Sequence, residues 1–507
     1  MADYDVIVIG AGNGGLTAGA QLSARGARVL VLEQHNLPGG FASSFVRGRF
    51  EFEPSLHELC DVGPAGDKGG VRKLLEDDLG VEVDFVRVPE AYRMILTTEN
   101  LDVTMPFGIE EFADAVDGYV PGSRAAVRSY LDLCREVLDA LNYLGASKGN
   151  PDKKVLLKQH GNFLRTAPYT VEEVTARFGI PEQAKKILYA YWCYIGIPVS
   201  RMSFTLWSAM LYKYLATGGY IPRYRSHEMS AAIEERILKN GGRIEYNTRV
   251  DKILVEQGKV TGVETSHGER FSTSHVICNA SPTVAYNRLV FPKSEVPRTA
   301  YRQVNARTHG SSAFVVYLGL DASPEDLGLM DYSYFIYEHM DIDRLYASFS
   351  DLCDPRVQAT VCLNRAVPDC SPPGTTIMSF TILYRPGVWD RVAPEDYVSV
   401  KRKVADRLIR NFEQAMHVSL RGRIEEIEIA TPQTFARYTG SFAGGVYGYE
   451  PEPWDSIIPR MMCMQDELYI EGLRFAGGNA FRTYGYSSSL LSGQTVALLT
   501  LRDMGVV

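Results

Sequence analysis

The sequence predicts an α/β protein in which a parallel sheet forms one domain and a mixed sheet with helices forms a second. Two observations favour this class. A short apolar strand, a glycine-rich turn, a helix and a second strand follow one another within the first 33 residues. Alternating and apolar runs at 243–265 and 312–320 indicate further strands between long helical stretches. A chain of 507 residues is long enough for two or three domains.

The N-terminal segment has the order of a βαβ unit. Residues 5–9 are a Val/Ile run typical of a strand that is covered on both faces of a parallel sheet. Gly10, Gly12 and Gly15 then fit the pattern G-x-G-x-x-G, before a helix-spaced segment and a strand at 28–32. Gly10 makes the tight turn, Gly12 admits a pyrophosphate and Gly15 packs the helix on the strand. The unit therefore predicts a Rossmann-like domain that binds a dinucleotide at a helix N-terminus.

Glu33 ends the second strand, 23 positions after Gly10. A carboxylate at this place accepts hydrogen bonds from both hydroxyls of an adenosine ribose and repels a 2′-phosphate. The motif therefore indicates a dinucleotide whose adenosine ribose is not phosphorylated.

The stretch HNLPGGFASSF follows Glu33 and contains the pair Gly39-Gly40. Here the sequence resembles the glutathione-reductase-type FAD superfamily, specifically its phytoene desaturase, carotenoid isomerase and retinol saturase group. The resemblance implies FAD as cofactor and an FAD-binding domain of the glutathione reductase type (GR2). It also implies which residues contact FAD. These are Gly10, Gly12, Asn13, Gly14, Gly15, Glu33, Gln34, Gly39, Gly40, Phe41, Ala42, Ser43, Leu56, Val250, Ala280, Gly478, Asn479, Ser488 and Ser489.

A G-x-x-F-D-x-G-x-H-like stretch approaches the isoalloxazine ring in that group. The matching residues are Gly48, Phe52, Glu53, Ser55 and His57. Glu53 stands for the usual Asp and Ser55 for the usual Gly. These departures leave the FAD prediction intact and concern the side of the flavin that faces the substrate.

Strands at 243–247, 249–256 and 260–265 and a return at 275–279 resemble the group's second pass through the FAD domain. In that pass the backbone around Val250 meets the adenine, and the segment near Ala280 lies over the pyrophosphate.

The C-terminal stretch LRFAGGNAFRTYGYSSSLLSGQTVALL predicts a glycine-rich loop followed by a helix. Residues 490–493 match the L-L-S-G helix start that covers the flavin in the group, while Ser487 and Ser488 replace its usual Pro-Gly. A helix N-terminus directed at the N1/C2=O edge of the flavin would stabilise negative charge there by about 0.3 to 2 kcal/mol.

Four side chains near these segments are candidates for proton transfer: His57, Arg482, Tyr484 and Tyr486. His57 has the unperturbed pKa best suited to proton transfer near neutral pH. A purely structural histidine is the competing interpretation.

Between 189 and 224 the chain has ten aromatic residues in 36 positions. Phe204, Trp207, Leu211 and Tyr214 recur at helical spacing, which is typical of a core helix, or of the wall of a tunnel or membrane face for a long apolar substrate. Next to this segment two arginines could receive a carboxylate or phosphate of a substrate, or lie in a solvated loop paired with Glu228 or Glu234. The candidate substrate residues are Trp207, Tyr220, Arg223 and Arg225.

Two discontinuous domains follow from these assignments. We expect residues 1–70, 225–295 and 436–507 to form the FAD-binding domain. Residues 71–224 and 296–435 then form an α+β substrate domain with a mixed sheet, in which 312–320, 376–384 and 424–430 are strands. Its helical, aromatic-rich cap spans about 109–216.

The composition narrows the class of partners. The net charge is −8 and no basic run is long enough for a phosphate-backbone surface, so nucleic acid is not an expected partner. The eight cysteines form no CxxC pair and no metal-spaced cluster, so no metal site is expected. We expect a cytoplasmic protein, because the sequence shows neither a signal peptide nor a membrane span, with contact to a membrane surface as an alternative.

The leading hypothesis is an FAD-dependent oxidoreductase that acts on C–C or C=C bonds of a polyene, isoprenoid or lipid-like substrate, by desaturation, saturation or isomerisation. The alternatives are an amine or alcohol oxidase or a natural-product tailoring oxidase, and a lipid- or prenyl-binding escort protein on the same fold. The motifs do not select the electron acceptor, because no second G-x-G-x-x-G follows a strand.

Overall fold

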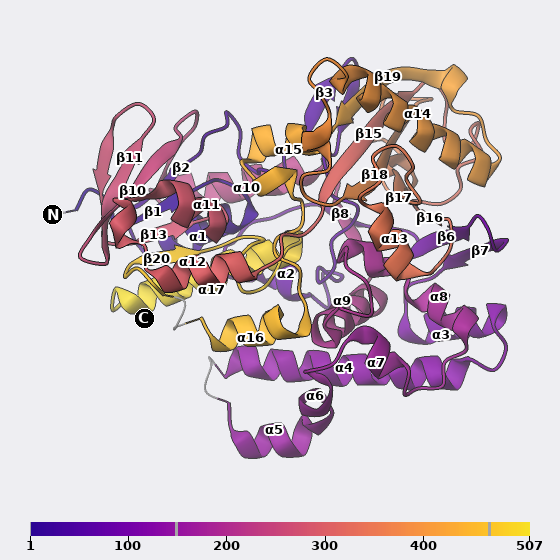
Figure 1. Ribbon diagram of the computed structural model, residues 1–507, viewed down its shortest axis with the longest axis horizontal. Helices are drawn as coiled ribbons and strands as arrows, with labels where there is room; N and C mark the ends of the chain where they lie inside the picture. The colour runs from indigo at the N-terminus through magenta and orange to yellow at the C-terminus, as the bar shows by residue number, and fades with distance from the viewer. Residues whose placement is uncertain (1, 148–150, 465–467, 507) are drawn as a thin grey trace.

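A five-stranded parallel sheet forms the centre of one half of the molecule (Figure 1). The computed structural model describes residues 2–147, 151–464 and 468–506. The strand order is β20-β13-β1-β2-β9, and every neighbouring pair is parallel. The strands are β1 (Val6–Ile9), β2 (Val29–Leu32), β9 (Arg243–Glu245), β13 (Val276–Cys278) and β20 (Leu473–Phe475). Segments from both ends and the middle of the chain therefore build one sheet, and the strands predicted at 5–9 and 28–32 are confirmed.

Three helices form an apolar layer with this sheet: α1 (Asn13–Ser23), α10 (Ser226–Lys239) and α17 (Tyr486–Asp503). Helices α1 and α17 approach each other closely because glycines lie at the crossing. A Cβ atom on Gly493 would lie 2.2 Å from the carbonyl oxygen of Gly14, and one on Gly14 would lie 2.5 Å from the amide nitrogen of Gly477. A second apolar cluster joins the parallel sheet to a four-stranded sheet of β10 (Val250–Glu256), β11 (Lys259–Thr265), β12 (Arg270–Ser272) and β14 (Val290–Phe291).

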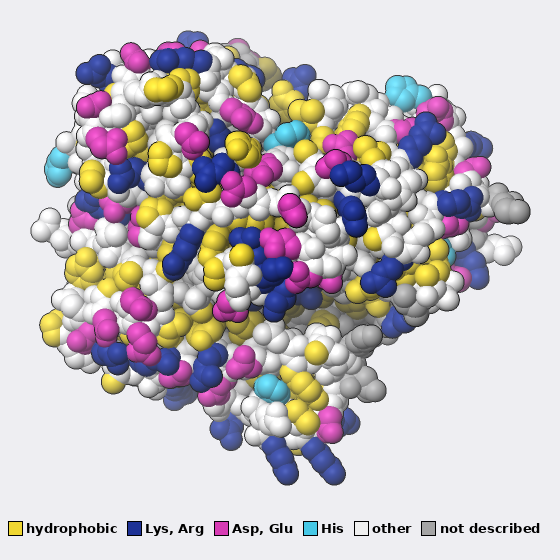
Figure 2. Space-filling view, turned by 180° about the vertical axis from the view of Figure 1, so that it is seen from behind, with side chains coloured by type: hydrophobic (Ala, Val, Ile, Leu, Met, Phe, Trp, Pro, Cys, Tyr) yellow, Lys and Arg dark blue, Asp and Glu magenta, His cyan; other side chains and the backbone are white. Residues whose placement is uncertain are grey.

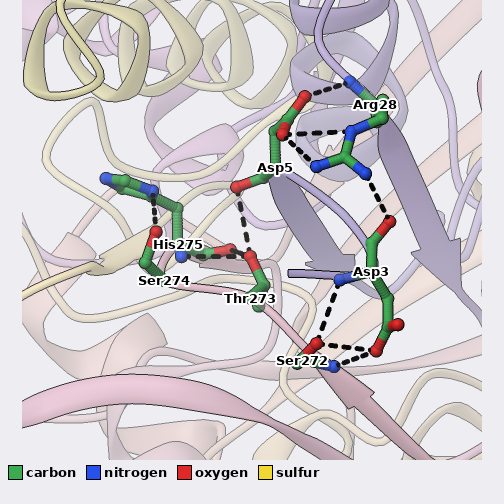
Figure 3. Close-up of polar contacts among 7 residues, drawn as sticks. All are labelled: Asp3, Asp5, Arg28, Ser272, Thr273, Ser274 and His275. Carbon is green, nitrogen blue, oxygen red and sulfur yellow. Dashed lines mark hydrogen bonds and ion pairs between the residues drawn. The ribbon is translucent and has the colours of Figure 1, made fainter. Parts of the chain in front are cut away.

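Polar contacts fasten the chain start to this second sheet (Figure 3). The Asp3 carboxylate accepts hydrogen bonds from the amide and hydroxyl of Ser272 at 2.8 and 2.7 Å. Arg28 donates to the Asp5 carboxylate at 2.7 Å, and the hydroxyl of Thr273 donates to the carbonyl of Asp5 at 3.1 Å. The hydrogen bond from Arg28 holds the pKa of Asp5 below its usual value. These contacts fix the register of β1 between β2 and β13.

A seven-stranded mixed sheet forms the other half, with the order β19-β15-β18-β17-β16-β6-β7. The three strands predicted at 312–320, 376–384 and 424–430 are confirmed as β15 (Ser312–Leu320), β18 (Thr376–Tyr384) and β19 (Ile424–Ala430). Four further strands complete the sheet. They are β6 (Tyr92–Leu96), β7 (Leu101–Met105), β16 (Ser333–Tyr337) and β17 (Val357–Cys362).

Helices between 109 and 217 form the cap below this sheet in Figure 1. The two long ones are α4 (Arg124–Ala146) and α9 (Phe204–Thr217), which bury side chains in one shared apolar cluster. The remaining cap helices are α3 (Ile109–Tyr119), α5 (Lys153–Gln159), α6 (Gly161–Thr166), α7 (Val171–Thr175) and α8 (Glu182–Leu188).

Two apolar clusters extend past the domain boundaries that we expected at residues 70 and 295. Val71, Leu75 and Val81 pack in the same cluster as α1, and Ala300 and Val304 pack in the same cluster as β1. We therefore propose that the FAD-binding domain extends about ten residues beyond each of the boundaries expected at 70 and 295.

Candidate functional site

A cavity of about 1280 Å³ runs from the carboxyl ends of β1 and β2 to the cap helices. Ligands of open parallel sheets bind at this edge. Sixteen of the residues predicted to contact FAD line it, and Gly15, Ala42 and Ser43 do not. The sixteen are Gly10, Gly12, Asn13, Gly14, Glu33, Gln34, Gly39, Gly40, Phe41, Leu56, Val250, Ala280, Gly478, Asn479, Ser488 and Ser489.

The glycine loop makes room for a ligand at the start of α1. Gly39 donates its amide to the carbonyl of Ala11 at 2.7 Å and forms a bridge with Gly12. A Cβ atom on Gly12 would lie 2.7 Å from Nδ2 of Asn279, so glycine is required to keep this place open. A Cβ atom on Gly15 would lie 1.9 Å from the carbonyl oxygen of Gly10. Gly15 thus serves the packing of helix on strand, and lies away from the cavity.

The Glu33 carboxylate lies at the end of β2 and is held by two amides. Ala11 donates to its Oε2 at 2.6 Å and His35 donates to its Oε1 at 2.8 Å. The side chain is 8% exposed and lines the cavity, so it remains open to a ribose. Nearby, the Oδ1 atoms of Asn13 and Asn279 are buried without a hydrogen-bond partner among the described residues. The carboxylate fits the hydroxyls of an adenosine ribose, and the open glycine turn at the start of α1 fits the pyrophosphate of FAD. The two amide oxygens can accept only from donor groups of the cofactor, such as hydroxyls.

Helix α17 presents its first turn to the cavity. It begins at Tyr486, and no side chain caps the helix at its N-cap residue, Gly485. The amide of Ser489 is already bonded to the carbonyl of Gly485 at 2.9 Å. The first-turn amides available to a ligand are therefore those of Tyr486 to Ser488.

Two of the candidates for proton transfer are structural. The hydroxyl of Tyr484 donates to the carbonyl of Ile195, and that of Tyr486 donates to the carbonyl of Phe41 at 2.6 Å. Burial raises the pKa of both phenols well above the usual value. The tyrosines thus fasten the helix start to two distant loops and are poorly suited to exchange protons.

His57 lies in the cavity wall with its Nε2 3.2 Å from the hydroxyl of Thr381. Burial lowers the pKa of His57 to about 4, so the ring is neutral at neutral pH. Its Nδ1 has no partner among the described residues. The ring can therefore act as a hydrogen-bond partner to a ligand, whereas a role as a proton donor is disfavoured.

Glu58, which the sequence analysis missed, is a second buried group in the wall. Its Oε1 accepts a hydrogen bond from Tyr194 at 2.7 Å, and its Oε2 has no partner among the described residues. Burial raises the pKa of Glu58 to about 8, with a smaller contribution from the charge of Glu90. Glu58 is therefore a neutral carboxylic acid at neutral pH.

A Glu58→Gln variant tests this protonation state. Between pH 5 and 8 the wild-type carboxyl is protonated in the folded state and ionised in the unfolded state. Its contribution to stability is therefore present at low pH and is lost as the pH rises through 8. The amide of the variant does not titrate. We therefore expect the difference in free energy of unfolding, variant minus wild type, to be about 3 kcal/mol larger at pH 8 than at pH 5. Urea unfolding at both pH values measures this change. An equal difference at both pH values would show that Glu58 titrates normally.

The four candidate substrate residues lie outside the cavity. Trp207 is fully buried in the cap and donates to the hydroxyl of Tyr130 at 3.0 Å, and Tyr220 pairs with Leu59. Arg223 forms ion pairs with Asp84 and Asp369 at the surface. Arg225 is buried and donates to the carbonyls of Glu51, Arg223 and Cys370. None of the four lines the cavity in this structure, where they support the fold around it, and their contact with a substrate stays a prediction.

Beyond the segments predicted to hold the flavin, the cavity continues between two cap helices and one helix from outside the cap. We call this part the apolar arm. Its lining comes from α4, α9 and α16 (Ile457–Met462). Helix α9 therefore faces the core with Trp207 and Leu211 and faces the cavity with its other side. The apolar lining residues are Leu138, Leu141, Leu206, Ala209, Met210, Ile457 and Met461.

A buried ion-pair cluster anchors α16, one wall of this arm. The Asp455 carboxylate accepts two hydrogen bonds from Arg460, each at 2.9 Å, and one from Arg307 at 3.1 Å. The side chains of Asp455 and Arg460 are 5% and 2% exposed. The position of Met461 in the cavity wall depends on this cluster.

Two charged residues complete the site and were missed in the sequence. Lys213 of α9 pairs with Asp61 at 2.6 Å, across 152 positions of sequence.

Asn279 was missed as well, although it directly follows β13 and so occupies the carboxyl end of a parallel strand. A polar residue at the carboxyl end of a predicted parallel strand is a signal that could have identified Asn279 as a site residue. Among the described residues no cluster of metal-ligating side chains is found.

Known enzymes are similar to this chain in sequence. The chain is 24% identical to prolycopene isomerase 2 of an Oncidium hybrid cultivar over 99% of this chain and 84% of that protein. It is 24% identical to all-trans-retinol 13,14-reductase of Danio rerio over 88% of this chain and 77% of that protein.

Solved structures share the fold. An oxidoreductase from Methanosarcina mazei superposes with a TM-score of 0.63 at 16% identity, covering 97% of this chain and 99% of the other. Putrescine oxidase bound to putrescine superposes with a TM-score of 0.64 at 14% identity, covering 98% and 99%. The family model described as flavin containing amine oxidoreductase matches residues 14–497. The chain therefore belongs to the flavin-containing amine oxidoreductase family and is an FAD-dependent oxidoreductase.

Proposed function

We propose that this enzyme acts on carbon–carbon double bonds of an apolar polyene or isoprenoid-like substrate, by desaturation, saturation or isomerisation. The apolar arm between α4, α9 and α16 carries this proposal, because it has the lining that a long hydrocarbon chain requires. The relatives named prolycopene isomerase and all-trans-retinol 13,14-reductase support it, since both names give a polyene substrate.

FAD supplies hydride exchange between its flavin ring and a substrate carbon when it is bound. The protein holds the cofactor and the substrate in position and stabilises charge on them. The free amides at the start of α17 stabilise negative charge at the adjacent edge of a ligand by about 0.3 to 2 kcal/mol. His57 and Glu58 are both neutral in the cavity wall, which suits a substrate without charge along its chain.

Oxidation of amines is the main alternative, since putrescine oxidase has the same fold. An aromatic cage for an amine needs two rings with space between them. Tyr447 and Tyr484 both line the cavity, but their rings stack with centroids 4.7 Å apart and an interplanar angle of 22°. These rings touch each other, so no amine fits between them.

The test uses the purified FAD-loaded enzyme under anaerobic conditions. Retinol and a lycopene isomer are compared with putrescine and cyclohexylamine, with the flavin oxidised and with the flavin reduced by dithionite. We expect the polyenes to change the flavin spectrum or to be converted, and the amines to do neither. Bleaching by an amine together with no response to either polyene would refute the proposal. A folded preparation that binds no FAD would instead support the escort alternative.

We also propose that helices α5 and α6 rest on a membrane surface. Leu157 is 69% exposed and Leu164 is 40% exposed. Basic side chains surround them, and Figure 2 shows hydrophobic and protruding basic side chains together at the lower edge of the molecule. The basic residues are Lys153, Lys154, Lys158 and Arg165. No helix in the described part of the chain has the length and apolar character to span a bilayer.

Sedimentation with vesicles that contain anionic lipid tests this contact. We expect the double variant Leu157→Ser, Leu164→Ser to bind at least threefold less, because exposed leucines insert between lipids and serines do not. Leu238→Ser on α10 is the matched control, since Leu238 is 50% exposed at a distant position on the FAD-binding half. Equal binding of all three proteins would contradict the proposal.

A further inference from the structure

Arg482 is a half-buried cation in the cavity wall, in the loop between β20 and α17. It lines the cavity, and its Nε is buried without a hydrogen-bond partner. Burial lowers the pKa of the guanidinium, while the nearby charge of Asp61 acts in the opposite direction. An arginine keeps its proton under such conditions. The site therefore contains a positive charge to which none of the described residues is bonded.

The backbone around Arg482 is fixed by contacts of its neighbours. Thr483 is held in the left-handed region at a φ of 68°, which is rare for a β-branched residue, and is 1% exposed. Tyr484 bonds to the carbonyl of Ile195 and stacks on Tyr447. Strain of this kind persists where the surroundings hold a functional group in place. The position of Arg482 is thus set without any ion pair of its own.

The described carboxylates that line the cavity are all engaged elsewhere. Glu33 lies at the ribose end, bonded to two amides, and Asp251 pairs with Arg249. Asp61 is bonded at both oxygens, to Lys213 at 2.6 Å and to the amide of Gly70 at 3.1 Å. Glu58 is neutral below a pKa of about 8. Of these four, only Asp61 acts on Arg482, through its nearby charge, and its oxygens are bonded to Lys213 and Gly70 and not to Arg482.

We propose that Arg482 binds a carboxylate on the substrate, so that the substrate is an amphipathic acid whose apolar chain fills the arm between α4, α9 and α16. This inference rests on the proposed function and deepens it by naming the head group. A guanidinium forms two parallel hydrogen bonds with a carboxylate, which neither an alcohol nor a hydrocarbon can match. The buried Nε of Arg482 has no hydrogen-bond partner among the described residues, and a bound carboxylate would supply one. An amine head group would be repelled.

The experiment measures binding to the oxidised FAD-loaded enzyme by calorimetry and by perturbation of the flavin spectrum. Two matched pairs serve as probes: retinoic acid with retinol, and palmitic acid with hexadecanol. We expect each acid to bind at least tenfold more tightly than its alcohol. In Arg482→Met the affinity for the acids should fall at least tenfold while that for the alcohols stays within twofold. Arg482→Lys should restore part of the difference.

Arg270→Met is the matched control, because Arg270 is an arginine outside the cavity with an ion pair at the surface. It should leave all four affinities unchanged. Equal affinities for acid and alcohol in the wild type, or an equal loss for both in Arg482→Met, would overturn the inference. A change confined to the flavin reduction potential would do so too, since it would assign Arg482 to the cofactor. If only the saturated pair binds with the expected preference, the polyene proposal fails and the carboxylate site stands.

Discussion

Gly12→Val is expected to purify with less than one tenth of the wild-type flavin content. The new side chain would occupy the space between Gly12, Gly39 and Asn279, where a Cβ atom alone already lies 2.7 Å from Asn279 Nδ2. The pyrophosphate would lose its approach to the backbone at the start of α1. The ratio of flavin absorbance to protein absorbance after gel filtration measures this loss.

Gly422→Val is the control, because a Cβ atom there meets nothing within 4 Å and the backbone is not in the left-handed region. It should keep its full flavin content. Circular dichroism must show the Gly12 variant folded for the comparison to be valid. A folded, yellow Gly12→Val protein would contradict the assignment of the glycine loop as the phosphate cradle.

Asp455→Asn is expected to lower the free energy of unfolding by about 3 to 5 kcal/mol, the usual cost of removing one partner of a buried ion pair. Arg460 loses its carboxylate partner and is 2% exposed, so water cannot replace it. Because α16 carries Ile457 and Met461 into the apolar arm, affinity for long-chain ligands should fall as well. Urea unfolding at constant pH measures the first effect, and ligand titration measures the second.

Asp354→Asn provides the comparison. Asp354 also pairs with two arginines, Arg356 and Arg407, but its side chain is 54% exposed and the contacts are 3.5 and 3.4 Å long. An exposed pair of this kind contributes about 0 to 1 kcal/mol. Similar losses in both variants would mean that the Asp455 cluster is hydrated and does not anchor α16.

The cofactor half of the site was largely predictable because its signals are local. The glycine loop, the strand end at Glu33 and the start of α17 each involve short stretches whose roles follow from backbone geometry. The strands β15, β18 and β19 were likewise visible, since each is a continuous apolar or alternating run. The place of β16 and β6 in the same sheet was not visible, because β16 runs parallel to β6, a strand more than 230 positions earlier.

The substrate half was predicted less well for a physical reason. The regular stripe of Trp207 and Leu211 shows that α9 has a buried face, but periodicity cannot tell a packed core from a cavity wall. The structure places the cavity on the less regular side of α9, with Met210 and Lys213. The pair Asp61–Lys213 and the neutral acid Glu58 depend on contacts between distant segments, so no local pattern indicates them.

The crossing of α1 and α17 has a consequence for synthesis of the protein. β1 is the central strand of its sheet, yet its neighbour β13 and the outer strand β20 are translated some 270 and 465 residues later. At about 5 to 20 residues per second, the first helix waits roughly half a minute or more on the ribosome for its partner. Until α17 is made, the side of α1 that it covers stays exposed on the nascent chain, so a truncation that removes α17 disturbs the packing of the first helix as well.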